Sequence, residues 1–261
     1  MNQFIHKKSL GQNFLNNEKI INNIVSSCDF DKDTIILEIG PGEGALTLEL
    51  VKKAPYVIIY EIDNRLEKIL RHKLKDHNNF NLIMEDFLQS DVKKEVERFN
   101  DKKIKVIANL PYYITTPIVL KLIEDINPDE ITIMVQKEVA DRFSSSVNSK
   151  NYGEITVFLK TYYDIEKLFD VDRNNFDPAP NVDSSVIKFR KNNNHLKINN
   201  KDIYFKLLHD SFQFKRKNLR NNLKNYDLEK VSFILNKNDL TLNDRAENIS
   251  IDTFIEIANN L

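Results

Sequence analysis

The tetrapeptide Asn109-Leu110-Pro111-Tyr112 combines residue types that could do chemistry. It follows an apolar run, Lys105–Ala108, that predicts the end of a buried strand, and open α/β sheets bind ligands beyond the carboxyl ends of their strands. Pro111 fixes its own φ and favours an extended Leu110, so the Leu110 carbonyl and the Asn109 side chain are held in place. Two acceptors beside the Tyr112 ring would suit a planar ring that carries an amino group. Taken alone, the tetrapeptide fits an ordinary strand-ending turn equally well.

A glycine-rich turn lies earlier in the chain. Residues 34–39 predict a short apolar strand, and the sequence G-P-G-E-G at residues 40–44 leads from it into a helix. Glycine allows a tight turn and a close approach of backbone to ligand. The next predicted strand, residues 56–60, ends at Glu61, about twenty residues further on, where an acidic side chain commonly binds the ribose of a nucleoside cofactor. The G-x-G-x-G pattern alone also fits a purely structural strand-to-helix turn.

Four predicted strands therefore end in a glycine turn or a polar side chain. These ends are Gly40, Glu61, Asp86 and Asn109. The carboxyl ends of parallel strands share one edge, so we expect them to line a nucleoside-shaped cleft. The chain has no G-x-x-x-x-G-K-[ST] loop for a triphosphate, and Leu46 stands where a dinucleotide fingerprint has its third glycine. S-adenosylmethionine, a nucleoside without phosphates, fits this set best.

Length and composition limit the other classes of protein. A chain of 261 residues can form one sizeable α/β domain and a small appendage. No apolar run approaches the ~18 residues of a membrane span, and the amino terminus lacks the apolar core of a signal peptide, so we expect a cytoplasmic protein that does not contact a membrane. Cys28 is the only cysteine, which excludes an intramolecular disulfide and a zinc site built from several cysteines. We expect no metal.

The carboxyl-terminal part differs in charge and pattern. Residues 191–200 have no apolar periodicity and predict a linker, and residues 201–261 predict a small helical domain. Seven basic and two acidic residues lie between Lys201 and Lys224. Such a run is often just a solvated helix face, but it also suits contact with RNA phosphates. The candidate RNA-binding residues are Lys215, Arg216, Lys217, Arg220 and Lys224.

Taken together, the motifs resemble those of the rRNA adenine N6,N6-dimethyltransferases, of the small-subunit (16S) type. The matching segments extend over nearly the whole chain in the family's order, namely 8–15, 40–42, 109–112, 136–140, 148–153, 176–184 and 245–250. The resemblance implies an α/β fold. Residues 1–190 would form a Rossmann-like class I methyltransferase domain with a mixed, mostly parallel seven-stranded sheet, and residues 1–16 its amino-terminal arm. Residues 201–261 would form a small all-helical domain that binds rRNA.

The resemblance also implies residue roles. Glu61 would bind the cofactor ribose, Asp86 its adenine, and Asn109 would lie where cofactor and target meet. The implied cofactor-binding set is Gln12, Asn13, Leu15, Gly40, Gly42, Glu61, Ile62, Asp86, Phe87 and Asn109, and the arm becomes part of an active-site lid. The target adenine would be gripped by residues 109–112 and would stack between Tyr112 and Phe176. Ordinary loop packing is the alternative role for Phe176.

The implied activity is dimethylation of N6 on two adjacent adenosines near the 3′ end of small-subunit rRNA. S-adenosylmethionine would be the methyl donor and a pre-ribosomal 30S particle the partner, with the enzyme acting as a monomer. Two alternatives stay open. One is a 23S rRNA adenine N6-methyltransferase of the macrolide-resistance type, although such enzymes more often have Asn-Ile-Pro in place of Asn109-Leu110-Pro111. The other is a non-catalytic nucleic-acid-binding relative, as among mitochondrial transcription factors.

Overall fold

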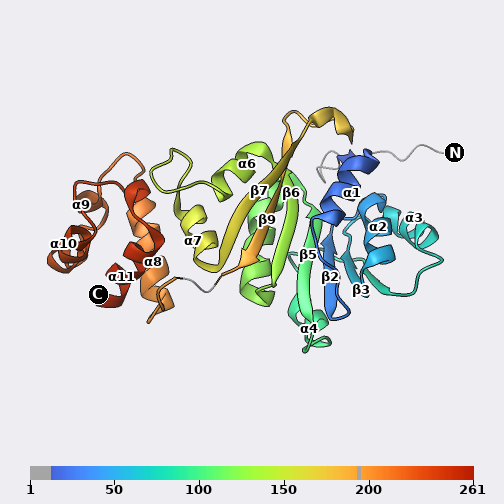
Figure 1. Ribbon diagram of the computed structural model, residues 1–261, viewed down its shortest axis with the longest axis horizontal. Coiled ribbons are helices and arrows are strands. Elements are labelled where there is room, and N and C mark those ends of the chain that lie inside the picture. The colour runs from blue at the N-terminus through green and yellow to red at the C-terminus, as the bar shows by residue number, and fades with distance from the viewer. Residues whose placement is uncertain (1–12, 193–194) are drawn as a thin grey trace. The chain divides into compact units, whose positions relative to one another are not determined.

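The computed structural model describes residues 13–192 and 195–261 (Figure 1). The chain forms two compact units. One holds the described residues up to Ala140 together with Glu166–Arg190, and the other holds Asp141–Ile165 and Lys191–Leu261. The sequence-based division placed residues 141–165 with the α/β domain, whereas the structure groups them with the carboxyl-terminal helices. Residues 1–12 of the expected arm and residues 193–194 of the expected linker lie outside the described residues.

The first unit is built on a seven-stranded sheet, as expected. In spatial order its strands are β4 (Phe80–Ile83), β3 (Tyr56–Tyr60), β2 (Thr34–Ile39), β5 (Lys103–Asn109), β6 (Glu130–Gln136), β9 (Ser184–Lys191) and β7 (Tyr163–Val171). Strands β4 to β6 run parallel to one another, and β9 is antiparallel to β6. All six residues of β2 are buried, as a strand covered on both faces requires.

One helix precedes the first parallel strand, and the other helices and turns of this unit lie between or after the strands. They are α1 (Glu18–Ser26), α2 (Ala45–Lys53), α3 (Glu67–Lys73), α4 (Val92–Glu97), α5 (Thr115–Lys121) and α6 (Lys137–Phe143), with a π-helical turn η4 (Leu122–Ile126) and 3₁₀ turns η2 (Asn64–Leu66), η3 (Tyr112–Ile114) and η5 (Arg173–Asn175). Asn17 begins α1, because its side-chain oxygen accepts the N–H groups of Lys19 and Ile20.

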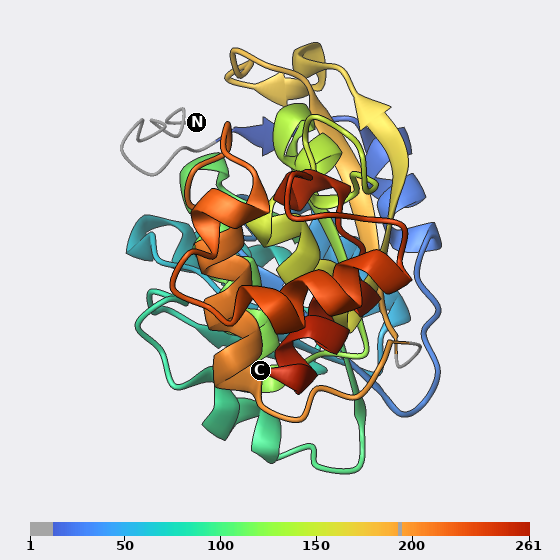
Figure 2. The same cartoon turned by 90° about the vertical axis from the view of Figure 1, so that its left-hand side faces the viewer.

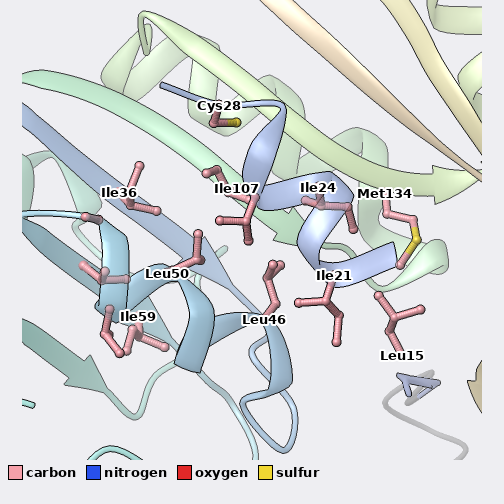
Figure 3. Close-up of a cluster of buried hydrophobic side chains, with 14 of the residues drawn as sticks. Leu15, Ile21, Ile24, Cys28, Ile36, Leu46, Leu50, Ile59, Ile107 and Met134 are labelled. Atoms are coloured by element: carbon pink, nitrogen blue, oxygen red, sulfur yellow. The ribbon is translucent and has the colours of Figure 1, made fainter. Parts of the chain in front are cut away.

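The core of this unit lies between the sheet and the first helices. Figure 3 shows side chains from both sides meeting there: Ile36, Ile59 and Ile107 come from strands, and Ile24 and Leu50 from α1 and α2. All five are almost completely buried. Their burial fixes the sheet beneath α1 and α2, and so fixes the strand ends from which the functional side chains project.

A separate two-stranded sheet ties the beginning of the described chain to a distant segment. Strand β1 (Phe14–Leu15) pairs antiparallel with β8 (Phe176–Asp177). The Asn16 N–H also donates to the Asn175 carbonyl at 3.0 Å. The end of the amino-terminal arm is therefore held by residues about 160 positions later in the sequence.

The second unit is helical, as expected for residues 201–261 (Figure 2, orange to red). Its helices are α7 (Glu154–Tyr162), α8 (Lys201–Phe212), α9 (Leu219–Asn222), α10 (Leu228–Lys237) and α11 (Ile251–Asn260), with a 3₁₀ turn η6 (Ala246–Asn248). Val157 of α7 belongs to the same buried cluster as Tyr204, Leu207 and Phe254. Because that burial depends on packing between segments far apart in sequence, the local pattern of residues 154–162 could not reveal it.

Candidate active site

A cavity of about 420 Å³ lies at the carboxyl ends of the parallel strands. All four predicted strand-end residues line it. Because the strands neighbour one another in the order β4-β3-β2-β5, these residues follow along the edge as Asp86, Glu61, Gly40 and Asn109. From β2 the next strands are added on one side, and from β5 they are added on the other. Doubly wound folds bind their ligands at such a switch point in the strand order, here between β2 and β5.

The glycine turn forms one wall of this cavity. Gly40 and Gly42 have φ of 70° and 58°, a region that side-chain-bearing residues rarely adopt. The Gly42 N–H donates to Glu61 Oε2 at 3.2 Å. Phe14 lies directly against Gly42, since a Cβ built on that glycine would fall 2.7 Å from the Phe14 ring. The turn is thus a backbone cradle, with a residue of the arm packed on it.

Glu61 is held in place by backbone groups. Its side chain is only 5% exposed. Oε1 accepts a hydrogen bond from the Asp63 N–H at 2.8 Å, and Oε2 accepts the one from the Gly42 N–H. Burial raises the pKa of this carboxyl above its ordinary value, partly opposed by these backbone hydrogen bonds. Each oxygen still has a lone pair, so a fixed carboxylate can accept the two hydroxyls of a ribose.

Glu38 is a cavity residue that the sequence reasoning missed. It lies within β2, is 1% exposed and lines the cavity. Burial raises its pKa to about 8, and nearby Glu61 adds to the rise. Its Oε2 accepts no hydrogen bond from the described residues, which fits a bound ligand that carries a donor or positive charge. The sequence feature that could have revealed it is an acidic residue inside an otherwise apolar strand, T-I-I-L-E-I at residues 34–39.

The Asn109 amide and the Leu110 backbone lie at the cavity wall. Asn109 Nδ2 donates to the Asn13 carbonyl at 3.4 Å, which leaves Oδ1 as an acceptor. The Leu110 side chain is 1% exposed, and its N–H donates to the Met134 carbonyl at 3.2 Å. No donor in the described part of the chain bonds the Leu110 carbonyl. The structure therefore places both residues at the cavity, with an oxygen of each left without a donor from the described residues.

The two tyrosines that follow differ in environment. Tyr112 lines the cavity, and its hydroxyl lies 2.5 Å from Ser184 Oγ. Tyr113 also lines the cavity but is 58% exposed. An aromatic ring fixed by its hydroxyl and a second, exposed ring therefore stand beside the Asn109 amide.

Phe176 is the predicted site residue that the structure does not bring to the cavity. It is 5% exposed, pairs with Leu15 across β1 and β8, and belongs to the core cluster. It is not among the residues that line the cavity. In this structure Phe176 contributes to the packing of the core. The short β1–β8 pairing, invisible in the local sequence, turns this side chain inward.

The other predicted cofactor residues lie as follows. Asn13, Leu15, Ile62 and Phe87 all line the cavity. Ile62 is 49% exposed, and Phe87 stacks edge-on against Tyr60 with ring centroids 5.4 Å apart. Gln12 lies outside the described residues.

The predicted RNA-binding residues are all exposed. Lys215 and Lys217 border a second cavity, of about 340 Å³, within the helical unit. Arg142 also borders it, and its buried Nε has no hydrogen-bond partner among the described residues. Sequence reasoning missed Arg142, because residues 141–165 were assigned to the other domain. The cavity therefore has three cations on its wall, although Glu154 and Glu247 border it too.

The described residues contain no group of three or more His, Cys, Asp or Glu side chains that could hold a metal ion. None of their helices is both long and apolar enough to cross a membrane.

A mostly parallel seven-stranded sheet, with a glycine turn and an acidic residue ending adjacent strands around one cavity, defines a Rossmann-like class I methyltransferase. The sequence model of the family described as ribosomal RNA adenine dimethylase matches residues 3–261. The chain belongs to this family.

Named relatives agree with this assignment. A ribosomal RNA small subunit methyltransferase A from Fusobacterium nucleatum is 44% identical over 98% of this chain and 97% of its own length. The enzyme of the same name from Oceanobacillus iheyensis is 40% identical over 98% of this chain and 90% of its own length.

Two solved structures are similar in fold. A dimethyladenosine transferase from Plasmodium falciparum has a TM-score of 0.75 at 26% identity, covering 93% of this chain and 95% of that one. The 23S rRNA methyltransferase ErmE has a TM-score of 0.74 at 27% identity, covering 95% and 99%. The chain is thus an rRNA adenine methyltransferase by family, and its rRNA target needs a separate argument.

Proposed function

We propose that this enzyme dimethylates N6 of two adjacent adenosines near the 3′ end of small-subunit rRNA, with S-adenosylmethionine as methyl donor. The observation that carries the chemistry is the pair of acceptors, Asn109 Oδ1 and the Leu110 carbonyl, at the cavity beside Tyr112. The names of the most similar relatives support the small subunit as the source of the target.

Asn109 and Leu110 would act by positioning. The N6 lone pair of adenine is delocalised into the ring, so the amino group is a poor nucleophile. If the two oxygens accept both N6–H bonds, the nitrogen is drawn towards a tetrahedral geometry and its lone pair is localised. The bound cofactor supplies an already activated methyl group on sulfur. No general base is needed, because the methylated nitrogen is acidic enough to lose its proton to water.

The residues around the cavity suit the proposed cofactor. Glu61 would accept the ribose hydroxyls, and Asp86, at the end of the next strand, would accept the adenine amine. The close backbone approach at Gly42 leaves no room for a side chain on the turn. Glu38 Oε2, which accepts no hydrogen bond from the described residues, would accept one from the cofactor's ammonium group. Each of these three carboxylates would pair an acceptor on the chain with a donor on the cofactor.

The target base must leave its stack to reach this cavity. Tyr112 would support one face of the extruded adenine, a contact worth about 1–3 kcal/mol. Because Phe176 is buried in the core, the other face is covered either by the exposed Tyr113 or by a rearrangement that releases Phe176. We propose the first arrangement, since Tyr113 already lines the cavity.

The wider partner is proposed to be a pre-ribosomal 30S particle, bound by a monomer in the cytoplasm. The basic residues of the helical unit would contact rRNA phosphates. Residues 191–261 contain twelve basic and nine acidic side chains, whereas the whole chain has a net charge of -1. RNA attraction would therefore be concentrated in the helical unit.

Methylation of large-subunit rRNA is the second candidate, because ErmE resembles this chain over nearly its full length. Labelled methyl transfer to purified unmethylated small and large ribosomal subunits tests the choice. We expect transfer to the small subunit only, approaching four methyl groups per particle, two on each of two adenines. Transfer to the large subunit would establish the second candidate. Cofactor binding with no transfer to either would instead indicate a non-catalytic relative.

A further inference from the structure

The turn between α8 and α9 presents an aromatic ring to solvent. Phe214 is 57% exposed, whereas Phe212, two residues earlier, packs against Tyr152 and Phe254. The Phe214 backbone is nevertheless fixed: its carbonyl accepts the Lys217 N–H at 2.8 Å and the Asn222 side chain at 3.5 Å. The exposed ring therefore stands on a well-held turn.

Three cations without acidic partners follow this ring directly in the sequence. Lys215, Arg216 and Lys217 follow it directly, and all three are exposed. Within the described residues none of them forms an ion pair; Lys215 instead donates to the Lys150 carbonyl. Some other basic residues of this unit do form ion pairs, such as Lys206 with Asp210 and Lys237 with Glu256. The charge on the turn is thus available to an anionic partner.

A single exposed apolar residue is ordinary on a protein surface. Phe214 differs because it combines a fixed backbone with adjacent uncompensated cations. Single-stranded nucleic acids are bound by this combination: cations hold the phosphates, and aromatic faces stack on bases at about 1–3 kcal/mol per base. A protein partner with an apolar surface would leave the three cations desolvated and unpaired, which is costly.

We propose that Phe214 stacks on an unpaired nucleobase of the rRNA while Lys215, Arg216 and Lys217 hold the flanking phosphates. This rests on the proposed function for the identity of the RNA. It adds a second base contact, in the helical unit, to the one at Tyr112. Recognition at this point would then require unpaired RNA, because a base inside a duplex has both faces covered by its neighbours.

The helical unit offers a matched control. Phe233 of α10 is 61% exposed, similar to Phe214. One face of its ring is already occupied by the Lys237 ammonium, 4.8 Å from the ring centroid. Phe233→Ala therefore removes an equally exposed phenylalanine from the same unit, at a position where one ring face is already covered and the covering cation, Lys237, is paired with Glu256.

The test measures binding of the full-length protein to unmethylated small subunits, and to an RNA oligonucleotide either single-stranded or paired with its complement. Phe214→Ala should weaken binding to small subunits and to the single strand by roughly 5- to 100-fold. Affinity for the duplex and for S-adenosylmethionine should be unchanged. Phe214→Trp should restore binding and Phe214→Leu should not. The slope of log affinity against log salt should stay constant in Phe214→Ala, but fall by about one in Lys217→Ala.

Two results would overturn the proposal. One is Phe214→Ala binding as tightly as Phe233→Ala, and the other is Phe214→Leu restoring binding as well as Phe214→Trp. The wild-type methyl-transfer assay separates this inference from the proposed function. Failure to methylate small subunits with intact, Phe214-dependent binding would refute the activity alone, and methylation with Phe214-independent binding would refute the stacking alone.

Discussion

The Tyr112 hydroxyl and the Ser184 hydroxyl lie 2.5 Å apart. This contact joins the loop after β5 to the first residue of β9, 72 positions later. Ser184 is completely buried and pairs with Gln136 across the β6–β9 ladder, so it is a rigid anchor. Burial raises the Tyr112 pKa, and the hydrogen bond to Ser184 partly opposes the rise. The tilt of the Tyr112 ring is therefore set by β9, the strand that runs antiparallel to β6.

Removing this hydrogen bond should loosen the ring without removing its face. We expect Ser184→Ala and Tyr112→Phe each to lower kcat/KM for small subunits by about 2- to 10-fold, the equivalent of one neutral hydrogen bond. The double variant should lose no more than either single one, as a double-mutant cycle would reveal. Tyr113→Phe, on the exposed neighbour, is the control and should be unchanged. Additive losses would mean that the two hydroxyls act separately.

The Asn109 acceptor should matter for transfer more than for cofactor binding. Asn109→Ala removes one of two oxygens that grip the target amine, so methyl transfer should fall by about 100-fold or more. The affinity for S-adenosylmethionine, measured by calorimetry, should change much less. Asn100→Ala, an exposed asparagine beyond the opposite end of the sheet, is the matched control. Equal turnover by Asn109→Ala and wild type would remove the proposed mechanism.

The glycine turn can be tested with a pair of alanine substitutions. Gly42→Ala places a Cβ 2.7 Å from the Phe14 ring at a φ of 58°. It should cost about 1–3 kcal/mol of unfolding free energy and weaken cofactor binding by at least about 10-fold. Gly153→Ala is the control, because its backbone is extended and no atom lies within 4 Å of the added Cβ. If both variants bind the cofactor alike, the turn does not cradle it.

Glu38 should make the stability of the free enzyme depend on pH. Its pKa is raised from 4.5 to about 8 by burial, so between these values the unfolded chain has lost a proton that the folded protein keeps. Stability should therefore fall as pH rises from about 5 to 8. Glu38→Gln lacks this ionisable group, and its unfolding free energy relative to wild type should rise across that range by on the order of 1 kcal/mol or more.

Melting curves of the cofactor-free proteins at several pH values measure this difference. Glu97→Gln, at the exposed end of α4, should differ from wild type by a constant amount. A Glu38→Gln difference that is equally flat would show that the Glu38 carboxyl is ionised in the folded protein throughout the range.

Phe176 separates packing from base stacking. As a core residue, Phe176→Ala should cost about 3–5 kcal/mol of unfolding free energy, and Phe176→Leu should cost less than about 1.5 kcal/mol. We expect Phe176→Leu to retain most methyl transfer, because an apolar side chain of similar size still supports β1 and β8. A stable Phe176→Leu protein with little transfer would instead return Phe176 to the stacking role predicted from the sequence.

Local patterns in the sequence are enough to identify the residues that end the parallel strands. Gly40, Glu61, Asp86 and Asn109 follow apolar runs directly, and the carboxyl ends of parallel strands share one edge. Their gathering at one cavity therefore follows from local patterns alone. The helical character of residues 201–261 was equally readable, because apolar periodicity is a local property.

Which distant side chains meet could be learned only from the folded chain. The contact of Tyr112 with Ser184, the packing of Phe14 on Gly42 and the burial of Phe176 each join segments far apart in the chain. The unpartnered oxygen of Glu38 and the place of residues 141–165 in the helical unit are of the same kind. Burial and hydrogen-bond partners depend on how elements pack, and nothing in the spacing of neighbouring residues specifies that packing.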